Sequence, residues 1–168
     1  MTTSLARRRW ITALTALSAC ATLILTSCAN DPGEPAVQPS EAKKSIIQLV
    51  EQSTAAVGGD WAVFSGPAVR NCGQPDGADG AAYIYIVERM DTEGADPEAD
   101  VAAMTALWER LHINVEQYHS GGADPIKGVR GTGGPLNSIA FEADPERYSV
   151  TGVSECSDGD PLRLRLED

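Results

Sequence analysis

The sequence predicts an α+β fold, a two-layer sandwich in which an antiparallel sheet of about five strands carries two helices on one face. Two observations lead to this class. Segments with apolar residues at helical spacing and segments rich in β-branched and aromatic residues follow in the order helix, strand, strand, helix, and then strands to the end. The length of 168 residues allows one domain with a core and is too short to expect two.

The first helix is expected at the start of the globular domain, which we place at residues 40–168. Ser40 is the candidate N-cap, and Gly58 and Gly59 end the helix. The apolar residues of this segment fall mostly on one helical stripe: Ile46, Ile47, Leu49, Val50 and Val57. The segment is therefore an amphipathic helix.

Two strands are expected after this helix. The segment "DWAVFSGPAV" indicates a strand that ends at Pro67. Residues 81–90, "AAYIYIVERM", are so rich in β-branched and aromatic side chains that they indicate a central strand. The turn-rich "NCGQPDGADG" between the two strands indicates a hairpin loop.

The second helix has a clear start signal. Asp96 is the N-cap, Pro97 is the first helical residue, and acidic residues fill the first turn. Apolar residues recur at helical spacing along the segment: Val101, Met104, Leu107, Trp108 and Leu111. This apolar face is expected to pack on the sheet.

After His112 the hydrophobic period changes to two. The segment "INVEQYH" indicates a strand, and "NSIAFEA" and "RYSVTGVSEC" indicate a hairpin around "DPE". The Gly-rich residues 129–137, "VRGTGGPLN", lack the Lys-Ser/Thr pair of a phosphate loop and indicate a loop between strands. Leu and Arg alternate in residues 162–167, "LRLRLE", which predicts a last strand.

The amino terminus has the composition of an export signal. Residues 1–27 contain a basic region with three arginines, an apolar region from Trp10 to Ser27, and a polar continuation, the order of a signal peptide. The tetrapeptide "LTSC", ending at Cys28, resembles a bacterial lipobox, whose cysteine receives a diacylglyceryl group and becomes the first residue of the mature chain. "RRRWI" loosely resembles a twin-arginine signal, and the export route stays open.

A second cysteine competes for lipidation, because "LSAC", ending at Cys20, also fits a lipobox. Lipidation at Cys20 would leave an apolar start to the mature chain, whereas Cys28 leads directly into the Pro-rich residues 29–39. If Cys20 is removed with the signal peptide and Cys28 carries the lipid, two cysteines remain. These are Cys72 and Cys156, an even pair in an oxidising compartment. The sequence therefore predicts lipidation at Cys28 and a Cys72–Cys156 disulfide.

The mature chain is strongly acidic. Residues 28–168 carry 10 basic against 24 acidic side chains, a net charge of −14. This field repels phosphate backbones and anionic lipid headgroups, which argues against nucleic acid as a partner. Residues 28–39 hold the lipidated Cys28 and a flexible Pro-rich tether that keeps the domain clear of the membrane.

No motif of a catalytic, cofactor or metal site is found, and no cofactor is expected. His112 and His119 are the two histidines, and neither lies in an HExxH or CxxC context. Three aromatic residues, Trp61, Tyr83 and Trp108, are candidates for lining a ligand groove between helix and sheet, with core packing as the alternative.

Several segments together resemble one group of proteins. The lipobox, "DWAVFSGPAVRNC", "AYIYIV", "ALWERLHINVE", the Gly-rich loop and "TGVSEC" are similar to the small secreted lipoproteins of actinobacteria, most nearly the mycobacterial LppA-like family. The resemblance implies an anchored α+β domain with a disulfide between Cys72 and Cys156 and no established enzymatic role. No functional residue is carried over.

The expected function is a non-catalytic binding or accessory module, lipid-anchored on the outer face of the cytoplasmic membrane. Its partners are expected to be the membrane, through the anchor, and an envelope protein or glycan, and the chain is expected to be a monomer. The first alternative is a carrier or sensor of a small apolar ligand, and the second is a cell-envelope hydrolase.

Overall fold

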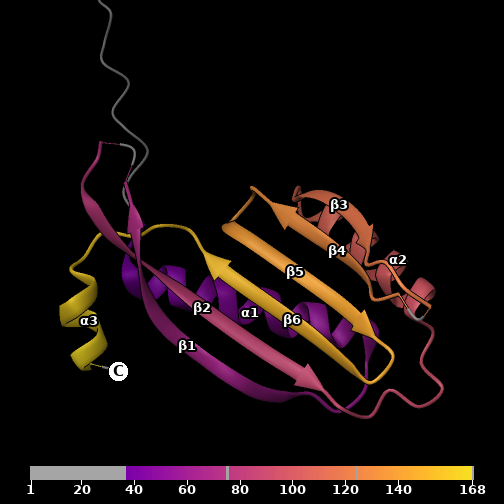
Figure 1. Cartoon of the computed structure of the whole chain (residues 1–168). Coiled ribbons are helices and arrows are strands. Elements are labelled where there is room, and N and C mark those ends of the chain that lie inside the picture. Colours follow the sequence, from indigo (N-terminus) through magenta and orange to yellow (C-terminus); the bar gives the residue numbers. More distant parts are fainter. Residues whose placement is uncertain (1–36, 75, 124, 168) are drawn as a thin grey trace, which may run out of the picture. The chain divides into compact units, whose positions relative to one another are not determined.

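The computed structural model describes residues 37–74, 76–123 and 125–167, so the predicted signal peptide and Cys28 lie outside the described residues. The predicted α+β class is confirmed, with a sheet of six strands rather than about five. All strand pairs are antiparallel, in the order β1-β2-β6-β5-β4-β3 (Figure 1). The elements are α1 (Pro39–Val57), β1 (Ala62–Gly73), β2 (Asp79–Arg89), α2 (Pro97–Arg110), β3 (Asn114–His119), β4 (Lys127–Thr132), β5 (Leu136–Asp144), β6 (Arg147–Ser154) and α3 (Pro161–Glu167).

The core lies between the sheet and the two long helices, which cover the same face (Figure 1). Alternate residues of the central strands point into it, with Phe141 of β5 and Tyr148 of β6 fully buried and their rings packed edge to face. The Tyr148 hydroxyl donates to Asp100 Oδ2 of α2 over 3.0 Å. Burial, and then this bond to Asp100, raise the pKa of Tyr148 far above its ordinary value.

Helix α1 packs tightly against Gly152 of β6. A Cβ atom at this position would lie 2.6 Å from Ile46 Cδ1 and 2.9 Å from a Val50 methyl group. The glycine thus allows the two layers to approach, and its lack of a side chain fixes how deeply Ile46 enters the sheet surface.

We expect Gly152→Ala to lower the free energy of unfolding by about 1–3 kcal/mol, because an extra methyl group overpacks the interface between α1 and β6. Chemical denaturation measures the change. Gly73→Ala is the matched control, because a Cβ there meets no atom within 4 Å. Equal stability of the two variants would contradict the close approach.

The predicted limits of α1 and β1 need correction. Helix α1 starts at Pro39 after Gln38, so Ser40 lies inside the first turn and makes no cap. Strand β1 continues through Pro67 to Gly73, with register shifts on either side of Ser65. Pro67 is tolerated because β1 is an edge strand with irregular pairing here, where a missing N–H costs no ladder hydrogen bond.

The sequence predicts a loop over the Gly-rich segment 129–137, and this is wrong for residues 129–132 and 136–137. Residues 129–132 belong to β4, which pairs with β3 and β5. Two glycines of β4 are required for packing rather than for a turn: a Cβ at Gly131 would lie 2.6 Å from Ile113, and one at Gly128 would lie 2.5 Å from the Tyr118 ring. The turn is confined to residues 133–135.

The predicted last strand is also wrong, because residues 161–167 form helix α3. Asp160 accepts a hydrogen bond from the N–H of Leu162 over 2.8 Å, and Pro161 occupies the first helical position. The alternating leucines have no common buried face, since Leu162 and Leu166 are 65% and 89% exposed. The local start signal therefore outweighs the period-two pattern.

Helix α2 begins as predicted. The Asp96 carboxylate accepts hydrogen bonds from the backbone N–H groups of Glu98 and Ala99. At the other end, His112 adopts a left-handed conformation with φ 59°, and the N–H of Ile113 reaches back to the Trp108 carbonyl over 3.0 Å. The helix ends here, and the chain continues directly into β3.

Candidate functional site

The predicted disulfide is present. It joins Cys72, near the end of β1, to Cys156, which follows β6, with 5.8 Å between the Cα atoms. Next to it, Ser157 pairs with Ala81 through two backbone hydrogen bonds. The bridge therefore holds the segment after the last strand against the β1–β2 hairpin.

The three aromatic residues predicted as a ligand groove are packing residues. Trp108 is fully buried, and its indole N–H donates to the Ser53 hydroxyl over 2.9 Å. Tyr83 is buried in the same core, and Trp61 is half-buried at its margin, where its N–H donates to the Gly58 carbonyl. None of the three lines either of the two hollows described next.

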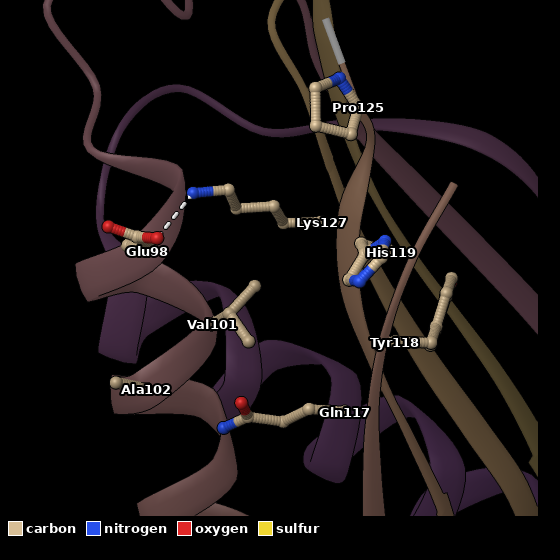
Figure 2. Close-up of a pocket in the computed structure, with 8 residues that line it drawn as sticks. All are labelled: Glu98, Val101, Ala102, Gln117, Tyr118, His119, Pro125 and Lys127. Atoms are coloured by element: carbon tan, nitrogen blue, oxygen red, sulfur yellow. Dashed lines mark ion pairs between the residues drawn. The ribbon is translucent and has the colours of Figure 1, made fainter. Parts of the chain in front are cut away.

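The described part of the domain has hollows on its surface, and two of them are considered in turn. One, of about 400 Å³, lies beside the start of α3 and is lined by Asn71, Asp79, Gly159, Asp160, Pro161 and Leu162. The other, of about 370 Å³, lies between α2 and the β3–β4 hairpin and is half open to solvent. We call the second the α2–β3 groove; its lining residues are Glu98, Val101, Ala102, Gln117, Tyr118, His119, Pro125 and Lys127 (Figure 2).

The α2–β3 groove has an apolar wall with polar groups around it. Val101 and Ala102 of α2 form the wall. At one end, Lys127 Nζ and Glu98 Oε1 form an ion pair of 2.6 Å that links β4 to the first turn of α2 (Figure 2). At the other end, the Gln117 side-chain amide donates to Thr105 Oγ1 over 2.9 Å. Since Glu98 is 80% exposed, the ion pair contributes less than about 1 kcal/mol to stability.

The opposite side of β3 carries a separate group of side chains. Tyr118 borders the α2–β3 groove, but its side chain points away from α2 in Figure 2, and its hydroxyl donates to Glu142 Oε1 over 3.0 Å. The Arg130 guanidinium lies 4.2 Å from the centre of the Tyr118 ring. Burial, followed by the bond to Glu142, raises the pKa of Tyr118. Strand β3 therefore has one side turned to the α2–β3 groove and one to the open face of the sheet.

Sequence reasoning missed this groove, although one signal was present. Side chains of β3 that face α2 are expected to be apolar wherever α2 covers them. Val115 is apolar and packs against the core. Gln117 and His119 occupy the next two positions on that face and are polar and exposed. His112 lies apart, exposed at the end of α2.

The groove and the root of the N-terminal segment lie at opposite ends of the sheet. Val37 accepts a hydrogen bond from the N–H of Asp158, close to the first residues of β2. His119, in contrast, belongs to a row of paired residues that crosses the sheet to Arg89, the last residue of β2. The distance between these ends is about 30 Å at the rise of a strand.

The described residues contain no group of three or more His, Cys, Asp or Glu side chains placed to hold a metal ion. Within the same residues, none of the helices has the length and hydropathy needed to cross a bilayer.

Comparison with known proteins gives a fold and no family. No family model matches the chain, and no curated protein matches it. A crystal structure of a DUF4853 family protein from Actinomyces odontolyticus is similar, with a TM-score of 0.57 and 17% sequence identity. The match covers 74% of this chain and 71% of that chain. At this identity the likeness establishes a shared α+β fold and nothing about activity.

Proposed function

We propose that this chain is a lipid-anchored binding module on the outer face of the cytoplasmic membrane, and that it contacts an envelope partner through the α2–β3 groove. The anchor is the diacylglyceryl group expected on Cys28, and residues 29–36 continue it to the described domain. Membership of the small actinobacterial lipoproteins is part of this proposal.

The observation that carries the proposal is the placement of the groove relative to the tether root. The α2–β3 groove lies at the end of the sheet opposite Val37, the first described residue, so a partner can reach the groove without contacting the start of the described domain. An open hollow with an apolar wall and polar ends is suited to contact with another molecule.

The side chains of the α2–β3 groove favour a binding function over a catalytic one. Its acidic and basic side chains, Glu98 and Lys127, are engaged with each other. The ring of His119 is exposed, and its contact within the described residues is to the neighbouring backbone carbonyl of Ser120 at 3.4 Å. No acid of residues 37–74, 76–123 and 125–167 therefore orients this imidazole as a general base requires.

The carrier alternative has less support. The aromatic side chains proposed to line its cavity, Tyr83 and Trp108, fill the core between helices and sheet. A small apolar guest would be bound best by an enclosed apolar cavity, whereas the α2–β3 groove is half open and has two apolar lining residues on α2.

We expect Cys28→Ser to abolish acylation and the cleavage that makes residue 28 the first residue of the mature chain. The reason is that the thiol of Cys28 is the acceptor of the diacylglyceryl group, and cleavage follows that modification. Mass spectrometry of the protein purified from cells, with metabolic labelling by an alkyne palmitate, measures both effects. Cys20→Ser is the matched control and should leave labelling unchanged. An unmodified Cys28 in the native protein would end the proposal of a lipid anchor.

A further inference from the structure

The two edge strands of the sheet, β1 and β3, differ in whether another element covers them. On the β1 edge, Arg165 of α3 donates to the Val69 carbonyl over 3.2 Å and to Asn71 Oδ1 over 2.7 Å, so a helix covers the strand. On the β3 edge, no strand or loop of the described residues pairs with the outer side. An uncovered edge strand is a template for another strand.

The register identifies the free backbone groups of β3. The N–H of Ser120 bonds to the Ile126 carbonyl, which makes this pair the hydrogen-bonded kind. By alternation, residues 114, 116 and 118 also bond to β4, and Val115, Gln117 and His119 turn their N–H and C=O groups outward. Two of these three, Gln117 and His119, are residues whose side chains line the α2–β3 groove.

We infer that the α2–β3 groove binds an extended segment of a partner polypeptide, which adds to β3 as an antiparallel seventh strand. This inference rests on the proposed binding function, but not on the lipid anchor. Strand addition gives affinity through backbone hydrogen bonds, and alternate side chains give specificity.

The side chains on the two sides of β3 predict which residue types the partner's extended segment carries. Side chains opposite Val115, Gln117 and His119 would lie toward α2, against Val101 and Ala102, and should be apolar.

The side chains between them would lie on the open face beside Glu116, which is exposed and forms no ion pair within the described residues. Tyr118 and Arg130, its neighbours on that face, are engaged with each other. An alternating segment of apolar and basic residues is therefore complementary. A second copy of this chain is disfavoured, because each copy carries a net charge of −14 over residues 28–168.

The probe for this inference is an acetylated, amidated hexapeptide of alternating valine and lysine with a fluorescent label. Its binding to the full-length protein, purified in detergent in whichever processed form cells produce, is followed by anisotropy at low salt. We expect binding of this peptide and weaker binding of the valine–glutamate counterpart. Methylation of the valine backbone nitrogens should abolish binding, since those N–H groups bond to β3, whereas methylation of the lysine nitrogens should be tolerated.

On the protein side, we expect Gln117→Pro to weaken binding about tenfold, because it removes an outward N–H and leaves a peptide carbonyl unpaired. Its N–H does not bond to β4, so the fold should persist. Gln117→Thr is the matched control: it also loses the contact with Thr105 but keeps the N–H and should bind normally.

Three results would overturn the inference: no binding of the valine–lysine peptide, binding that survives both methylation patterns, or a dimer in light scattering that Gln117→Pro dissociates. The comparison of the two methylated peptides tests the inference even if the Gln117→Pro variant does not fold. The mass of residue 28 is measured separately, so failure of strand addition and failure of the anchor are distinguishable.

Discussion

Replacing both Cys72 and Cys156 by serine is expected to lower the free energy of unfolding by as much as about 4.5 kcal/mol. The bridge closes a loop with a sequence separation of 84 residues, and cross-linking a loop of this length removes much of the conformational entropy of the unfolded chain. Urea denaturation of the oxidised wild type and the double variant measures the difference.

The reduced wild-type protein is the control for this prediction, and it should unfold at the same urea concentration as the double variant. Local bonds persist in both, since the Gln74 side-chain amide donates to Asp158 over 2.9 Å and Ser157 remains paired with Ala81. A loss below about 1 kcal/mol would show that these contacts, rather than the bridge, hold the segment after β6.

Trp108→Ala is expected to cost about 3–5 kcal/mol, the second large effect. Trp108 is 0% exposed and lies where α2 meets α1, so its removal leaves a cavity between the two helices and the sheet. It also removes the donor to the Ser53 hydroxyl, which in turn donates to the Leu49 carbonyl over 2.8 Å. Thermal and urea denaturation measure the loss.

Trp61→Ala is the matched control for Trp108→Ala, because Trp61 is half-buried at the margin of the core. We expect it to cost less than half as much. If instead Trp61→Ala were the more destabilising change, the assignment of Trp108 to the centre of the core would be wrong.

Local signals in the sequence were sufficient for the elements that carry their own start and stop residues. Asp96 and Pro97 predicted the first turn of α2, and the structure has the cap as expected. The same dipeptide stands at Asp160 and Pro161, where it starts helix α3 although the alternating leucines after it predict a strand. A cap followed by proline is the stronger signal when the alternating face is not buried.

Tertiary contacts decided the elements that were missed. Gly128 and Gly131 disfavour a strand by local propensity, but both stand where Tyr118 or Ile113 leaves no room for a side chain. The polar Gln117 and His119 are a signal for the α2–β3 groove, but they do not locate it, because the groove depends on β3 being an outer strand. That position follows from the pairing of β2 with β6, a contact that no local pattern encodes.

The pairing of β2 with β6 also determines when the domain can fold. Without it the sheet is two separate pieces, a hairpin of β1 and β2 and a meander of β3 to β6. The pairing of β2 with β6 places Ile84 opposite Val153, two residues far apart in the chain. Contacts between such distant residues form slowly during folding. A chain whose residues after Asp144 are not yet available for pairing has no continuous core to close, and it stays exposed to proteases until its last strand joins the sheet.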